Sequence, residues 1–147
     1  MNLLDRFRRD KPVSTLDEDR YLSDDERALA ERLLRQFAPP EAVVFLPQLD
    51  HARVTGRCSC GCPTVDLTVP SEFRVASPCQ ERPLADAFGR VNGKLVGIML
   101  FQTDGLLCLL ETYRLEDFSD DPFGLPAIDT IQPCVWSNEQ AKPQTEA

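Results

Sequence analysis

Three cysteines occupy every second position in Cys58-Ser59-Cys60-Gly61-Cys62, a segment that holds half of the chain's six cysteines. Thiolates are strong ligands for zinc and copper(I), and they are also among the side chains most readily oxidised. The cluster therefore indicates a metal site, a dithiol redox site, or a turn that contains small buried thiols. The sequence favours the third role, for reasons of spacing.

Zinc is the alternative, and it commonly needs four ligands. Alternate sulfurs on a straight strand would lie about 7 Å apart, too far for a disulfide between neighbours, whereas a bend at Gly61 and Pro63 would let them converge. The chain has no C-x-x-C and no second cysteine pair, which weighs against the usual zinc knuckle. The expected ligands are Cys58, Cys60, Cys62, Cys79 and His51, with Cys108 and Cys134 as further sources of a fourth ligand.

A dithiol redox role for Cys60-Gly61-Cys62 is a second alternative. Redox cysteines usually lie at a helix N-terminus, which lowers the pKa of the thiol, and no helix is expected here. A catalytic triad would have to use His51, the chain's only histidine, and the sequence has no glycine-rich phosphate-binding motif. We therefore expect a protein without catalytic activity and without a cofactor other than zinc.

The elements that must position this cluster begin with one helix. Ser23 and Glu26 form a capping-box pattern, which predicts a helix that starts at Ser23. An apolar stripe at helical spacing follows, and two consecutive prolines end the pattern. The stripe consists of Leu29, Leu33 and Phe37, flanked by Ala30 and Leu34.

From Ala42 onward, short β-like runs alternate with turn residues. Residues 52–58 and 64–69 alternate in polarity and predict a hairpin with the cysteine cluster at its tip. Asn92-Gly93 predicts a tight hairpin turn between residues 84–91 and 94–101, and a further strand is expected over 106–113. The predicted fold is α+β, an N-terminal helix packed on an antiparallel, hairpin-rich sheet of about four to six strands.

The length of 147 residues fits a single domain. We expect a folded core over residues 20–136, with flexible ends at 1–16 and 137–147. Residues 122–136 have no clear periodicity and are expected to be extended. Their apolar side chains could dock on the core: Phe123, Leu125, Ile128 and Trp136.

The formal net charge is -8, and residues 111–147 carry eight acidic and two basic side chains. An acidic surface repels nucleic acid and attracts basic proteins. No apolar run is long enough to span a membrane, and the N-terminus has no signal-peptide pattern, so a cytoplasmic location is expected. The residues expected to bind a partner are Glu111, Glu116, Asp117, Asp120 and Asp121.

These observations favour a non-catalytic protein-binding domain that presents acidic residues to a basic partner. An immunity protein that neutralises a basic toxin is the most concrete member of that class. A zinc-binding domain is the alternative hypothesis, and a thiol-based redox protein is the second.

The stretch from Arg57 to Val65, together with Leu109-Leu110-Glu111-Thr112-Tyr113, resembles small bacterial proteins of uncharacterised function. These proteins carry an R-C-x-C-G-C-P-[ST]-V stretch and a later L-E-x-Y stretch. The likeness covers residues 50–115. It implies a bacterial, single-domain, cytoplasmic protein, and it implies no activity or cofactor.

Overall fold

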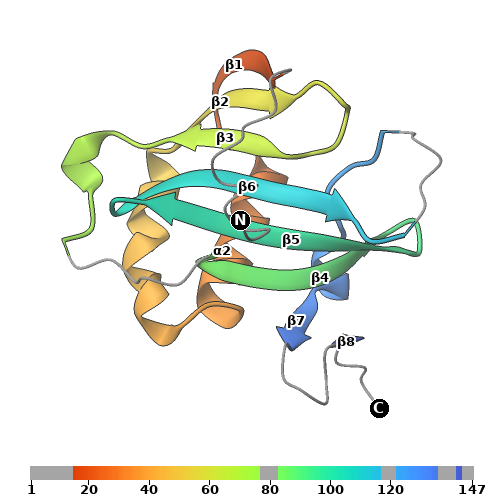
Figure 1. Cartoon of the computed structure of the whole chain (residues 1–147). Helices are drawn as coiled ribbons and strands as arrows, with labels where there is room; N and C mark the ends of the chain where they lie inside the picture. The colour runs from red at the N-terminus through yellow and green to blue at the C-terminus, as the bar shows by residue number, and fades with distance from the viewer. Residues whose placement is uncertain (1–14, 77–82, 117–121, 136–141, 144–147) are drawn as a thin grey trace, which may run out of the picture.

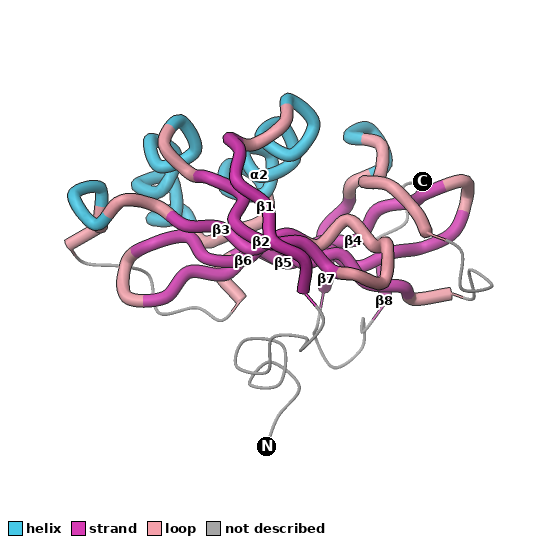
Figure 2. The backbone as a smooth tube through the Cα atoms, turned by 90° about the horizontal axis from the view of Figure 1, so that it is seen from above, coloured by secondary structure: helices cyan, strands magenta, loops and turns pink. Residues whose placement is uncertain are grey.

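The computed structural model describes residues 15–76, 83–116, 122–135 and 142–143, which form two layers. One layer is an antiparallel sheet, and the helices lie on one side of it (Figures 1 and 2). The α+β class is confirmed, although the sheet has more strands than the expected four to six. The strands are β1 (Thr15–Tyr21), β2 (Arg53–Cys58), β3 (Val65–Thr68), β4 (Ala85–Val91), β5 (Lys94–Thr103), β6 (Leu106–Arg114), β7 (Gln132–Val135) and β8 (Lys142–Pro143), in the spatial order β1-β2-β3-β6-β5-β4-β7-β8.

Helix α2 (Asp24–Gln36) begins where the sequence predicted. The side chain of Ser23 accepts a hydrogen bond from the Glu26 N–H, and the Glu26 carboxylate accepts one from the Ser23 N–H. This reciprocal pair satisfies two donors that the first helical turn leaves without partners. The helix buries the predicted stripe, including Leu29 and Leu33, against the sheet.

Residues 40–50 differ from the expected β-like run. They form the 3₁₀ helix η1 (Pro40–Asp50), which packs beside α2 and buries Phe45 and Leu49. A short apolar run fits a buried strand and a helical turn equally well, so periodicity could not separate the two. Among the described residues, no helix is long and apolar enough to cross a membrane.

Gln48 on η1 is a polar residue inside this core, with 1% of its surface exposed. Its amide nitrogen donates to the carbonyls of Phe73 and Gly105 at 3.0 and 2.9 Å. Its amide oxygen accepts from the Leu107 N–H at 2.9 Å. One side chain therefore joins η1, the turn between β5 and β6, and the short 3₁₀ helix η2 (Ser71–Phe73).

The predicted hairpins are all present. β2 pairs with β3, β4 with β5, and β5 with β6. Asn92 and Gly93 have φ angles of 51° and 82°, and Asp104 and Gly105 have 57° and 82°, so both turns need the left-handed region that these residue types tolerate.

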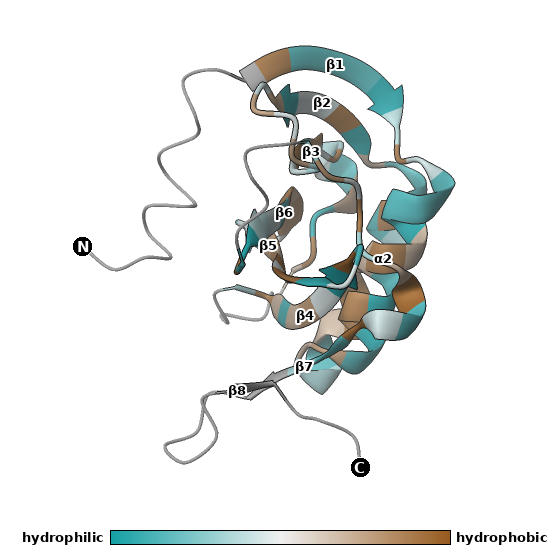
Figure 3. Ribbon diagram, turned by 90° about the vertical axis from the view of Figure 1, so that its right-hand side faces the viewer, coloured by the Kyte–Doolittle hydropathy of each residue, from teal (hydrophilic) through white to brown (hydrophobic). Residues whose placement is uncertain are grey.

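Strand β5 lies at the centre of the sheet and is buried on both faces, as expected. Ile98 and Leu100 face the helices, where apolar residues of the strands and of α2 meet (Figure 3). Met99 and Phe101 belong to a second, smaller cluster with Leu109. The alternation places that cluster on the opposite face.

Three strands were not predicted, β1 at one edge of the sheet and β7 and β8 towards the other, where β8 falls within the end expected to be flexible, 137–147. The sequence places residues 15 and 16 in a flexible end and predicts no element for residues 17–21. The structure shows that residues 15–21 form β1, which pairs with β2. Its sequence is mostly charged, which is common in edge strands. It therefore lacks the alternation of apolar and polar residues by which the other strands were predicted. Strand β7 was expected only as extended chain. Phe123 is buried and Leu125 and Ile128 pack on the core, whereas Trp136 and residues 1–14 lie outside the described ranges.

Arg20 ties the edge strand β1 to α2. Its guanidinium donates to both carboxylate oxygens of Glu26, at 2.8 and 3.0 Å. Burial alone would raise the pKa of Glu26, but the hydrogen bonds from Arg20 and from Ser23 outweigh it and lower that pKa. The ionised carboxylate therefore stabilises the folded chain at neutral pH.

Replacing Gln48 by alanine should strongly destabilise the fold. The change leaves the buried Gly105 carbonyl, the half-buried Phe73 carbonyl and the Leu107 N–H without their partner, at a cost of about 2–4 kcal/mol in the free energy of unfolding. Urea denaturation measures this. Gln36→Ala, at an exposed position of α2, is the control and should change stability by about 0.5 kcal/mol or less. Equal losses in the two variants would contradict the role given to Gln48.

Arg20→Gln should lower the free energy of unfolding at neutral pH, because it removes the charged partner of the Glu26 carboxylate. The loss should be limited to about 1–2 kcal/mol, since Arg20 is 38% exposed and water screens part of the interaction. A carboxylate with a lowered folded-state pKa contributes its full stabilisation above the ordinary value of 4.5, and loses it as the pH falls through the lowered value. The two proteins should therefore converge in acid. Arg35→Gln, which breaks an exposed pair with Glu31, is the control and should have little effect at any pH. A difference that persists in strong acid would refute the assignment.

Candidate functional site

The three clustered cysteines lie at the tip of the β2–β3 hairpin, as predicted. Cys58 ends β2, and its carbonyl accepts from the Gly61 N–H at 3.4 Å. Gly61 has a φ of 96°, a conformation that other residues rarely adopt. The chain therefore bends sharply at the tip, which removes the straight-strand spacing that would have kept the sulfurs apart.

The bend brings the three sulfurs together. All three Sγ atoms lie within 4.8 Å of one another, and those of Cys58 and Cys60 are 2.9 Å apart. The Cys62 N–H also donates to the Cys60 Sγ at 3.4 Å. Cys60 is exposed and the other two are half-buried, so the expectation that all three thiols are buried is wrong, whereas the expected tight turn is present.

Thr64 fixes this tip against the middle of the sheet. Its hydroxyl accepts from the Thr112 N–H and donates to the Thr112 carbonyl, both at 3.0 Å. The Cys62 thiol in turn donates to the same hydroxyl at 3.4 Å. Thr64 thus continues the β3–β6 pairing by its side chain and holds Cys62 beside β6.

The sulfurs line a hollow of about 280 Å³. The Arg114 guanidinium lies 5.1 Å from the centre of the Phe123 ring, and both side chains belong to the wall. Pro122 lies against Gly61, where an added Cβ would come within 3.0 Å of it. The wall residues are Cys58, Cys60, Cys62, Glu111, Thr112, Tyr113, Arg114 and Phe123.

The three thiols differ in acidity. Burial, with a hydrogen bond to Cys60, raises the pKa of Cys58 to about 12, and burial also raises the pKa of Cys62. Burial acts on Cys60 in the same direction. There, hydrogen bonds from Cys58 and Cys62 and the charge of Arg114 outweigh burial and lower the pKa. Cys60 is therefore the first of the three to become a thiolate.

Of the other expected metal ligands, none described joins the cluster. His51 follows η1 at the far end of β2, where its ring stacks on Phe73 with centroids 3.8 Å apart. Cys108 lies within β6 and is 3.4 Å from the Thr103 hydroxyl. Cys134 lies in β7, four positions from β3 in the strand order. Cys79 lies outside the described residues.

The expected acidic partner surface is only partly described. Glu111 is half-buried at the hollow. Glu116 is exposed, accepts from the Leu95 N–H at 2.8 Å and lies 3.8 Å from Arg90. The other three residues, Asp117, Asp120 and Asp121, lie outside the described ranges.

Sequence reasoning did not single out Thr64, Arg114 or Phe123 as parts of this site. Their places depend on the pairing of β3 with β6 and on the path of residues 122–131, both of which are long-range features. A threonine directly after a cysteine cluster and an arginine at a strand end have no local signature.

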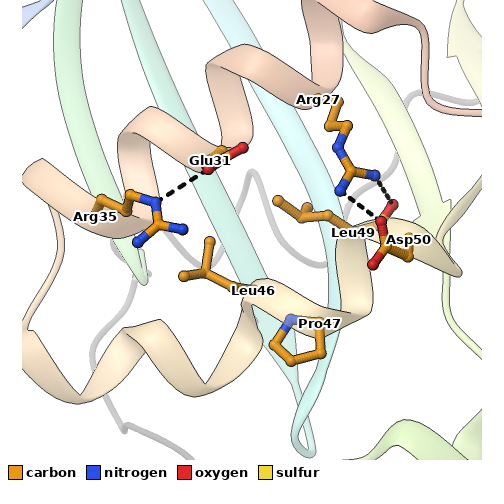
Figure 4. A pocket seen from close by; sticks show the side chains of 7 residues that line it. All are labelled: Arg27, Glu31, Arg35, Leu46, Pro47, Leu49 and Asp50. Atoms are coloured by element: carbon orange, nitrogen blue, oxygen red, sulfur yellow. Dashed lines mark hydrogen bonds and ion pairs between the residues drawn. The ribbon is translucent and has the colours of Figure 1, made fainter.

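A second hollow, of about 290 Å³, lies between α2 and η1 (Figure 4). Its charged side chains are paired with each other, Arg35 with Glu31 and Arg27 with Asp50. Its remaining wall is aliphatic. It contains no cysteine or histidine, so the cysteine hollow is the stronger candidate for chemistry.

Comparison of the chain with known protein families, with curated proteins and with solved structures found no match. The resemblance to small bacterial proteins therefore stays a prediction.

The difference in acidity predicts which thiol reacts first. Iodoacetamide should alkylate Cys60 before Cys58 and Cys62 at neutral pH, because thiolates are the reactive form. Tandem mass spectrometry of the tryptic peptide 58–74, which carries all three cysteines, measures this. Cys58→Ala removes a donor to Cys60, so it should move the alkylation profile of Cys60 to higher pH. Equal rates for the three thiols would contradict the assignment.

Proposed function

We propose that this protein binds a thiophilic metal ion, zinc in the first instance, through Cys58, Cys60 and Cys62. The convergence of the three sulfurs within 4.8 Å is the observation that carries the proposal. A tetrahedral zinc ion with Zn–S bonds of about 2.3 Å holds its sulfurs about 3.8 Å apart. The Cys58 and Cys60 sulfurs, at 2.9 Å, would have to move apart by about 0.9 Å to reach this separation, and no two of the three sulfurs are more than 4.8 Å apart.

The charges around the cluster support a bound cation. Three thiolates and one Zn²⁺ leave one negative charge, and the wall of the same hollow adds one cationic group, Arg114, and one carboxyl group, Glu111. Thiolates are soft ligands, so they favour zinc or copper(I) over magnesium or calcium. Thr64 can supply the outer support that metal sites commonly need, because its hydroxyl can turn from the Thr112 carbonyl and donate to Cys62 once that thiol has lost its proton.

Three protein ligands leave a fourth coordination position. Zinc sites of this kind fill it with water or with a bound molecule. Among the residues expected from the sequence, Cys79 is the one whose position the described structure does not fix. The fourth ligand is therefore either Cys79 or a molecule that enters the hollow beside Arg114, and a Cys79 variant separates the two.

The acidic protein-binding hypothesis stays a prediction based on charge. The net charge of -8 supports capture of a basic partner, and an immunity role is its most specific form. Cytoplasmic location and bacterial origin are likewise predictions from the sequence.

Elemental analysis of protein purified without chelator tests the metal site. We expect close to one zinc per chain, lost in Cys60→Ser because one of three thiolates is removed. Cys108→Ser is the matched control, since Cys108 is a half-buried thiol outside the cluster, and it should retain the metal. Cys79→Ser should lower affinity only if Cys79 is the fourth ligand.

A folded protein that is purified without metal and takes up no zinc or copper(I) on titration under reducing conditions would refute the proposal. Circular dichroism establishes that each serine variant is folded. Equal metal content in Cys60→Ser and Cys108→Ser would also contradict it.

A further inference from the structure

Within the cluster, the thiols of Cys58 and Cys60 are in direct contact. Their sulfurs are 2.9 Å apart, about 0.9 Å more than the S–S bond length of about 2.05 Å. A straight strand would not allow this approach, but the turn closed by the Gly61 N–H and the Cys58 carbonyl already bends the chain. A bond between the two sulfurs therefore needs only side-chain adjustment.

The two sulfurs are unequal in access. Cys60 is exposed, whereas Cys58 is half-buried. Two donors point at the Cys60 sulfur, the Cys58 thiol and the Cys62 N–H, and Arg114 adds a positive charge in the same hollow. A small oxidant from solvent therefore meets Cys60 first, with Cys58 already in contact as the second thiol.

We propose that Cys60 is a site of oxidation by peroxides and that Cys58 resolves the product into a Cys58–Cys60 disulfide. In the first step the Cys60 sulfur attacks a peroxide oxygen, an S–O bond forms, the O–O bond breaks, and an alcohol or water leaves. In the second step Cys58 attacks the Cys60 sulfenic acid, the S–S bond forms, the S–O bond breaks, and water leaves with the Cys58 thiol proton. Two thiols are oxidised by two electrons and one peroxide is reduced.

The disulfide has a consequence for the metal, which rests on the proposed function. It converts two of the three clustered thiolates into sulfurs that are poor zinc ligands and leaves Cys62 and the fourth ligand. Two ligands do not retain zinc against a chelator, so oxidation releases the ion. Reduction by a thiol restores the three ligands, and the hairpin tip acts as a reversible metal-release site.

Mass spectrometry of peroxide-treated full-length protein tests the disulfide. The tryptic peptide 58–74 should lose about 2 Da and regain it after reduction. Cys62→Ser should retain the loss of mass, because it leaves the pair intact, whereas Cys58→Ser and Cys60→Ser should abolish it. In Cys58→Ser the Cys60 sulfenic acid should accumulate and be trapped by dimedone.

Each result bears on one step. A disulfide that persists in Cys60→Ser, or that disappears in Cys62→Ser, would overturn the assigned pair. Oxidation of Cys60 directly to sulfinic acid in the unaltered protein would overturn the resolving role of Cys58.

Zinc release is followed in parallel with a chromogenic chelator, on protein loaded with zinc under reducing conditions. One equivalent should appear as the disulfide forms, and retention of zinc in the disulfide form would overturn the release step. The disulfide is also measured on metal-free protein. A failure of the reduced protein to bind zinc is therefore distinguished from a failure of the thiols to pair.

Discussion

The candidate site depends on the short ladder that joins β3 to β6. Only two residue pairs form it along the backbone, Val65 with Leu110 and Asp66 with Leu109. Thr64 extends it by two side-chain hydrogen bonds to Thr112, across 48 residues of sequence. Closing a loop of that length costs entropy, which the buried core around these strands must offset. Because of this ladder, the hairpin tip lies beside the end of β6, where Arg114 and Phe123 complete the hollow.

The chemistry of the tip follows from the lone pairs of three sulfurs. In the proposed metal-bound state they converge on an ion, and in the proposed oxidised state two of them are joined to each other. The two states exclude one another, because a sulfur in a disulfide is a poor ligand for zinc. The same bend at Gly61 serves both states, so metal binding and oxidation compete for one geometry.

Features that depend on local chemistry could be predicted from the sequence. The Ser23 and Glu26 capping box, the Asn92-Gly93 turn and the hairpin that carries the cysteines are all where the pattern placed them. Each of these features involves residues within a few positions of one another, so a short segment of the sequence contains all the interactions that form it.

Features that depend on distant partners could not be predicted. β1 is charged and forms only because β2 supplies an edge to pair with. η1 is helical because Phe45 and Leu49 pack into the core and Gln48 bonds to the β5–β6 turn. The position of Arg114 in the same hollow as the thiols depends on the β3–β6 register, which the spacing of residues in the sequence does not reveal.

X-ray absorption at the zinc edge, on reduced protein loaded with one equivalent, addresses the ligand set directly. Three sulfur neighbours at about 2.3 Å, with one further atom completing the shell, are expected for coordination by Cys58, Cys60 and Cys62. A first shell made only of nitrogen and oxygen atoms would contradict the thiolate site.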